Sequence, residues 1–179
     1  MRNMERPTRL RFLLNGAILL SIVQVGSAQT DAAMQESEDT HYFDFWPGTW
    51  VEVVDGVADT SATVFKVRQS VNPAAFEEDW RLVYDGKAHY STALRAWDQV
   101  TNRWMFSWVS DNGIFQVWDG VKVGDDWYIT KEFNIDGEIV HSRQAWIPDS
   151  DDRLTRILER STDGGETWET RYRTVFQRR

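Results

Sequence analysis

Glu78 and His89 are the two side chains whose types and spacing best suit acid–base chemistry. They flank Asp85-Gly86, a pair that tolerates the positive φ angles of a two-residue type I′ turn and therefore predicts a β-hairpin. In that hairpin both side chains point to the same face, which is the apolar face on residue count. A carboxylate and an imidazole that share a substrate can move a proton between its atoms. One interpretation is therefore a lyase or isomerase in which Glu78 and His89 act as acid and base.

A second interpretation treats the same strip of residues as a binding site. Arg95 is a diagonal neighbour of Glu78 across the hairpin, so their long side chains are within reach of one another. An isolated buried carboxylate is costly, and a buried salt bridge with solvated polar groups at a barrel mouth would explain both residues without any function. Alternatively, Arg95 or Arg156 holds the carboxylate of a ligand whose apolar body packs against tryptophans. The residues predicted to line this ligand site are Glu78, Trp80, His89, Ser91, Arg95, Trp104, Trp108, Gln144 and Arg156.

The strands that must position these residues are indicated by alternating apolar and polar side chains. Before the Asp85-Gly86 turn, alternate residues from Phe76 to Tyr84 share one face. From Phe43 onward, short alternating stretches are separated by turn residues at roughly even spacing. This pattern predicts an all-β fold, an antiparallel up-and-down meander of about nine or ten strands that closes into a barrel. A closed sheet of that size leaves room inside for side chains or for one small ligand.

The turns also predict which side chains face the interior. The connection from Asp98 to Arg103 sets Trp97 opposite Trp104, and Asn112-Gly113 predicts another hairpin. The later side chains that this counting places inside are Trp104, Phe106, Trp108, Phe115, Val117, Trp168, Tyr172 and Phe176. Several independent turns agree on one apolar face, and this consistency is the main support for the fold.

Three motifs along the chain resemble those of one group of proteins. They are Phe43-Asp44-Phe45-Trp46-x-Gly48-x-Trp50, then Trp97-Asp98 with Arg103-Trp104 and Trp108, then Ser161-x-Asp163-Gly164-Gly165-x-Thr167-Trp168. Over most of residues 43–178 the pattern is similar to bacterial lipocalin-like, calycin-type β-barrel proteins for which no reaction is established. Pro47 and Trp97 stand where that group more often has Leu and Tyr. The resemblance implies that Trp50 closes one end of a lipocalin-like barrel and that Arg171 or Arg173, on the last strand, packs over it.

The N-terminal composition indicates export. Four arginines are spread over residues 1–11. The mostly apolar stretch Phe12–Val25 follows, and the small residues Gly26-Ser27-Ala28 come after it. These are the features of a secretory signal peptide, and the apolar stretch is too short for a comfortable membrane span. We expect a signal peptide over 1–28, a flexible lead-in over 29–42 and one barrel domain over 43–179, located in the periplasm or secreted, with no membrane span after cleavage.

The composition excludes several kinds of site. The sequence contains no cysteine, which excludes disulfides, zinc–thiolate centres and thiol catalysis. His41, His89 and His141 lack the spacing of a preformed metal site, so we expect no metal and no cofactor. The formal net charge is −8, and an acidic surface repels phosphate backbones, so nucleic acid is not an expected partner.

Taken together, the residues predict an exported carrier or sensor that holds a small apolar or amphipathic molecule in a tryptophan-lined lumen. Two alternatives stay open at this point. One is the lyase or isomerase that uses Glu78 and His89 in the same lumen, and the other is a non-catalytic envelope protein that works through its surface. The oligomeric state is not predicted.

Overall fold

The computed structural model describes residues 37–179. The predicted signal peptide and most of the lead-in lie outside the described residues. The first described element is a 3₁₀ helix, η1 (Glu38–His41). Within residues 37–179 no helix is long and apolar enough to span a membrane.

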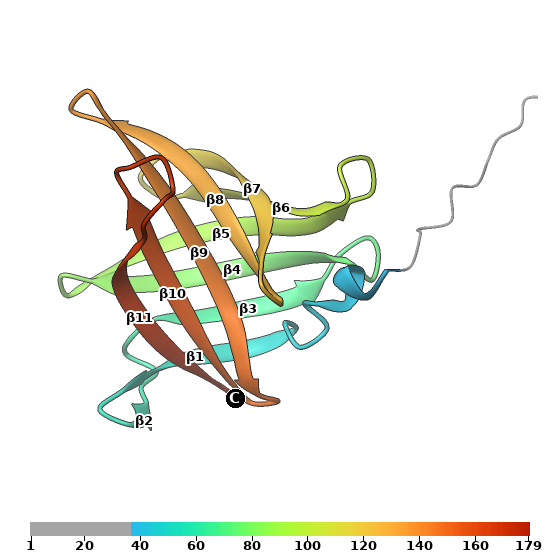
Figure 1. The fold of residues 1–179 in the computed structure, drawn as a ribbon. Coiled ribbons are helices and arrows are strands. Elements are labelled where there is room, and N and C mark those ends of the chain that lie inside the picture. The colour runs from blue at the N-terminus through green and yellow to red at the C-terminus, as the bar shows by residue number, and fades with distance from the viewer. Residues whose placement is uncertain (1–36) are drawn as a thin grey trace, which may run out of the picture. The chain divides into compact units, whose positions relative to one another are not determined.

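Eleven antiparallel strands follow η1 in the described chain. From β3 to β11, each strand pairs with the next one in the sequence. The short β2 pairs only with β1, and β1 also pairs with β3. Pairing of β1 with β11 closes ten of them into a barrel, so the predicted all-β meander and its closure are confirmed (Figure 1). The strands are β1 (Gly48–Val54), β2 (Val57–Ala58), β3 (Val64–Gln69), β4 (Ala75–Tyr84), β5 (Lys87–Asp98), β6 (Arg103–Ser110), β7 (Phe115–Val123), β8 (Asp126–Ile135), β9 (Glu138–Ser150), β10 (Arg153–Ser161) and β11 (Glu169–Arg178).

Trp50 fills one end of the barrel, as the resemblance to lipocalin-like proteins implies. Its side chain is fully buried, and its indole Nε1 donates a hydrogen bond of 3.0 Å to the carbonyl of Trp46. The arginine over its ring is Arg178, with Cζ 4.4 Å from the ring centroid. The expectation of Arg171 or Arg173 is therefore wrong. Because β11 runs antiparallel to β1, its last residues lie beside the start of β1, and Trp50 pairs directly with Arg178.

The end of the predicted lead-in is part of the folded structure. Asp39 in η1 accepts hydrogen bonds from Lys122 Nζ at 2.5 Å and Trp127 Nε1 at 3.2 Å, and its backbone carbonyl accepts one from Trp104 Nε1 at 2.9 Å. Hydrogen bonding to Lys122 holds the pKa of the Asp39 carboxyl below its ordinary value. Residues 38–42 thus attach to the rim of the closed end, where the composition alone suggested a mobile segment.

The hairpin that carries the candidate site has the predicted register. Leu82 pairs with His89, and Glu78 pairs with Ala93. The two turn residues, Asp85 and Gly86, have φ angles of 51° and 68°. Both angles are positive, as a type I′ turn requires.

The hairpin between β6 and β7, at Asn112-Gly113, differs from its prediction. Val109 pairs with Phe115, and the backbone N–H of Ser110 donates to the carbonyl of Ile114, so the loop has three residues (111–113) in place of two. Gly113 in this loop takes a φ angle of 82°. A shift of one residue moves every side chain to the opposite face of a strand. Phe115 and Val117 are consequently exposed, and Trp118 is buried inside the barrel in their place.

Trp168 also lies outside, against the prediction. A register shift between Leu158 and Glu159 interrupts the alternation along the β10–β11 pair. The Trp168 ring therefore packs on the outer face, where Arg143 Cζ lies 4.0 Å from its centroid. Tyr172 and Phe176, further along β11, line the lumen wall as predicted.

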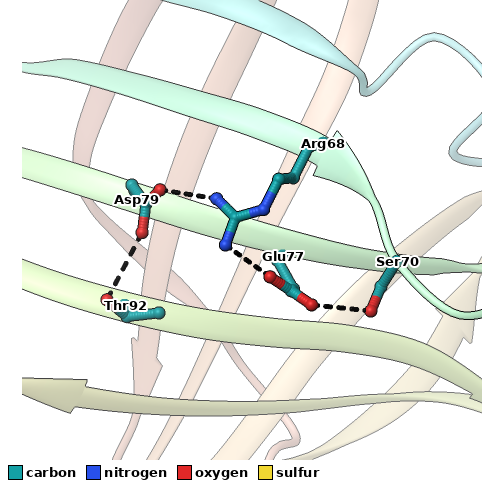
Figure 2. Close-up of polar contacts among 5 residues, drawn as sticks. All are labelled: Arg68, Ser70, Glu77, Asp79 and Thr92. Atoms are coloured by element: carbon teal, nitrogen blue, oxygen red, sulfur yellow. Dashed lines mark hydrogen bonds and ion pairs between the residues drawn. The ribbon is translucent and has the colours of Figure 1, made fainter.

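The outer face of β3 and β4 carries paired charges. Figure 2 shows Arg68 between Glu77 and Asp79, with Arg68 Nη1 2.7 Å from Asp79 Oδ2. Ser70 donates to Glu77 at 2.8 Å, and Thr92 reaches Asp79 at 3.4 Å. These groups are solvent-exposed, so each pair contributes little to stability. Arg68 is thus a cation whose charge is already balanced by two neighbours.

Candidate ligand-binding site

The lumen near Trp50 contains a completely buried carboxylate. Glu78 has no exposed surface and accepts three hydrogen bonds. Arg95 Nε donates to Oε1 at 2.8 Å, Trp46 Nε1 donates to the same oxygen at 2.9 Å, and Trp80 Nε1 donates to Oε2 at 2.9 Å. The buried salt bridge considered from the sequence is therefore present, and two indoles reinforce it. A carboxylate held by three donors in this way is a structural anchor.

The guanidinium of Arg95 lies in a cage of aromatic rings. Its Cζ is 4.5 Å from the Phe43 centroid, 5.2 Å from Trp46, 4.9 Å from Phe106 and 4.5 Å from Trp146. Ring faces at this distance attract a cation, more strongly where water is absent. Since Glu78 also balances its charge, Arg95 needs no further anion.

The structure does not bring the two predicted catalytic residues together. His89 pairs with Leu82, four residues along β4 from Glu78, which is about 13 Å at roughly 3.3 Å per residue. The His89 ring stacks on Tyr84 with centroids 4.1 Å apart, and its Nδ1 is 3.9 Å from Asp111 Oδ1. His89 thus belongs to the barrel mouth, and a shared proton with Glu78 is outside its reach.

A cavity of about 80 Å³ lies in the lumen beyond the buried salt bridge. Its walls are mostly apolar, with a few polar side chains, which is typical of small-molecule sites. The lining residues are Trp80, Leu82, Ser91, Ala93, Phe106, Trp108, Trp118, Ile129, Gln144, Trp146 and Arg156. We call this space the inner cavity.

Five of the predicted ligand-binding residues line the inner cavity: Trp80, Ser91, Trp108, Gln144 and Arg156. Glu78, His89, Arg95 and Trp104 lie elsewhere in the barrel. Trp104 faces inward but packs against Phe43 and Phe76 at the closed end. Trp118 is the main wall residue that the sequence interpretation missed, because its strand was assigned the wrong register.

Arg156 is the cation of the inner cavity. Its Nη2 donates to Gln144 Oε1 at 2.6 Å and to the Tyr172 hydroxyl at 3.0 Å. Its Cζ also lies 5.6 Å from the Trp146 ring centroid and 5.1 Å from that of Tyr172. Burial lowers the pKa of this guanidinium. Among residues 37–179 no carboxylate forms an ion pair with Arg156, and all its partners are neutral.

A second, wider cavity of about 350 Å³ meets the inner one at Arg156 and Leu82, which line both. Its lining residues are Glu52, Thr63, Leu82, Val83, Tyr84, Arg156, Tyr172, Thr174 and Phe176. We call this space the outer cavity. Its walls are more polar, and Glu52 is its only carboxylate among the described residues. The backbone N–H of Thr63 donates to Glu52 Oε2 at 3.0 Å.

No group of three or more histidine, aspartate or glutamate side chains within residues 37–179 is arranged to hold a metal ion. Comparison of the chain with protein-family models and with curated proteins gives no match. The feature of the molecule that bears on its function is therefore the lumen itself, a β-barrel interior that is compatible with ligand binding.

Proposed function

We propose that this protein is an exported carrier or sensor that binds a small apolar or amphipathic molecule in the barrel lumen. The proposal for export is supported by the signal-like composition of residues 1–28. The proposal for binding is supported by the inner cavity, whose aromatic walls surround a few polar groups. Kinship with lipocalin-like barrel proteins is part of the same proposal, and the packing of Arg178 on Trp50 supports it.

One observation carries the proposal: the two parts of the lumen are packed differently. At the closed end, Trp46, Trp50 and Phe65 fill the space completely and are fully buried. Further along, an equally aromatic wall leaves a cavity of about 80 Å³. Protein interiors are normally close-packed, with few voids larger than a water molecule, so a cavity lined by Trp80, Trp108 and Trp118 is a feature that a ligand would explain.

The lyase or isomerase alternative receives no comparable support. Glu78 is saturated with donors, and His89 lies at the mouth.

Titration of intrinsic tryptophan fluorescence tests the proposal, because four indoles line the inner cavity. We expect at least one small apolar or amphipathic compound, from a panel graded in size, to give a saturable change. Ala93→Leu should abolish it, since Ala93 is buried at the cavity wall. Ala96→Leu is the matched control on the same strand, because Ala96 does not line the inner cavity. Absence of saturable binding by the wild-type protein across the whole panel would reject the proposal.

A further inference from the structure

We infer that the ligand of the lumen is a short-chain monocarboxylate, whose carboxylate binds Arg156 and whose hydrocarbon end occupies the inner cavity. The inference rests on the proposed binding function and specifies its chemical class. It also selects Arg156 over Arg95, a choice that the sequence left open.

Charge identifies the anchoring residue. Arg95 has a carboxylate partner at 2.8 Å, whereas Arg156 has none within residues 37–179. Arg156 Nη1 makes no hydrogen bond with any residue in that range, so two N–H donors stay available for a ligand. A carboxylate matches the planar fork of a guanidinium better than any neutral group does. The Tyr172 hydroxyl accepts from Arg156, which leaves its own proton for a ligand oxygen.

Two further donors support a ligand that contains oxygen. Ser91 Oγ and Trp146 Nε1 are buried and have no hydrogen-bond partner among the described residues. Both residues line the inner cavity. An unsatisfied buried polar group costs about 1–3 kcal/mol, so a purely hydrocarbon ligand would leave that cost in place. Carboxylate oxygens close to Arg156 supply acceptors in the same cavity.

Volume limits the length of the hydrocarbon part. The inner cavity of about 80 Å³ is roughly half of the 150 Å³ of an engineered apolar cavity that binds benzene. It has room for a chain of about three to five carbons, by the same comparison. A longer chain would have to extend into the outer cavity, whose walls are more polar. Long-chain fatty acids and large planar ligands therefore fit this lumen poorly.

Glu52 limits the charge of the ligand. It shares the outer cavity with Arg156, so a ligand anchored on Arg156 has this carboxylate as a neighbour. A second negative charge on the ligand would lie either in the mostly apolar inner cavity, where it loses hydration, or in the outer cavity, where Glu52 repels it. The site is thus selective for one negative charge.

The inference is tested by isothermal titration of the wild-type protein with butyrate, butyramide, octanoate and succinate. Butyramide has nearly the shape of butyrate without its charge. We expect butyrate to bind at least about tenfold more tightly than butyramide, a difference of about 1.4 kcal/mol. Octanoate and succinate should each bind more weakly than butyrate. This comparison needs no variant, so it does not depend on the folding of a mutant.

Two variants locate the anchor. Arg156→Gln should reduce butyrate affinity to that of butyramide, while Arg68→Gln, which removes an exposed arginine on the outer face (Figure 2), should leave it unchanged. Glu52→Gln should raise the affinity for succinate. Equal affinities for butyrate and butyramide, or butyrate binding unaffected by Arg156→Gln, would overturn the inference while leaving apolar binding in the lumen intact. Failure of every compound in the graded panel would instead reject the proposed function.

Discussion

Arg95 and Arg156 are two arginines in the same lumen with opposite surroundings. Arg95 is almost fully buried, paired with Glu78 and enclosed by four rings. Arg156 has neutral hydrogen-bond partners and lies beside a cavity. The Trp146 ring contacts both guanidinium groups, at 4.5 Å and 5.6 Å from its centroid. The difference between them is therefore the presence of a carboxylate, since both have aromatic neighbours.

On the proposed function, this difference assigns stability to the closed end of the barrel and ligand binding to the open end. A buried charge is tolerable when paired and hydrogen-bonded, and the closed end satisfies that condition for Arg95 and Glu78. The open end leaves the charge of Arg156 without a directly paired carboxylate among the described residues, and an unpaired cation beside a cavity is a means of selecting an anion. Substitutions in the two regions should consequently affect different measurements.

The largest expected effect comes from breaking the closed-end pair. Glu78→Gln should lower the free energy of unfolding by about 3–5 kcal/mol, because it leaves the Arg95 charge buried without a partner. Arg156→Gln should lower it by only about 1 kcal/mol, because hydrogen bonds to Gln144 and Tyr172 are lost but no ion pair is. Urea unfolding followed by tryptophan fluorescence measures both. Equal losses for the two variants would remove the distinction between the arginines.

A double substitution sharpens the same comparison. Glu78→Leu combined with Arg95→Met removes both charges and keeps apolar volume. It should recover much of the stability lost in the single variant, since replacing a buried pair by apolar residues is often neutral or stabilising. A double variant as unstable as the single one would show that the hydrogen bonds to Trp46 and Trp80, and the packing, dominate over the charge.

Trp50→Ala tests the closed end by packing alone. The ring is fully buried and stacks near Phe65, with centroids 6.3 Å apart. Its removal should cost about 3–5 kcal/mol, measured by urea unfolding, and should leave ligand affinity unchanged wherever the variant is folded, because Trp50 is outside both cavities. A loss well under about 1 kcal/mol would contradict its role as a filler of the barrel end.

The smallest expected effect is at the rim, where η1 attaches. The Asp39 pKa is lower in the folded protein than its ordinary value of 3.8, chiefly because of Lys122. A lowered folded-state pKa stabilises the fold above that ordinary value, and the stabilisation is lost as pH falls through the folded-state pKa. At pH 6 the free energy of unfolding of the wild-type protein should exceed that of Asp39→Asn by at most about 1 kcal/mol. This difference should disappear as the pH is lowered towards 2. Urea unfolding at each pH measures it. A gap independent of pH would contradict this assignment.

The fold was predictable where a turn has only one plausible length. Asp85-Gly86 permits a two-residue turn, and the whole β4–β5 register follows from it. Asn112-Gly113 looks equally clear, yet the loop has three residues, and Phe115 and Val117 were assigned to the wrong face. The prediction for Trp168 fails for a related reason, since the register shift in the β10–β11 pair, where Arg171 is left unpaired, cannot be read from alternation. Alternation along a strand predicts which face a side chain occupies only as far as the next β-bulge or the next turn of unexpected length.

The sequence predicts which residues of the candidate site face inward. It does not predict which of them form the buried Glu78–Arg95 pair and which line a cavity. Glu78 and Arg95 are neighbours by register, so their pairing follows from β4 and β5 alone. The indole of Trp46 reaches Glu78 from a segment 32 residues earlier in the chain. Only this third element saturates the carboxylate and makes it structural. The cavity beside Arg156 likewise depends on which of many aromatic rings fill the interior, which is a matter of three-dimensional packing.

The arrangement of β1 and β11 has a consequence for biosynthesis. Arg178 donates to the carbonyl of Pro47, 131 positions earlier in the chain, and to that of Phe45. While a ribosome is still delivering the polypeptide, β1 has an unpaired side and no lumen exists. Such unpaired strands are sites of aggregation. A nascent chain therefore carries an open strand edge until its final strand arrives, and it acquires its pocket only at that moment.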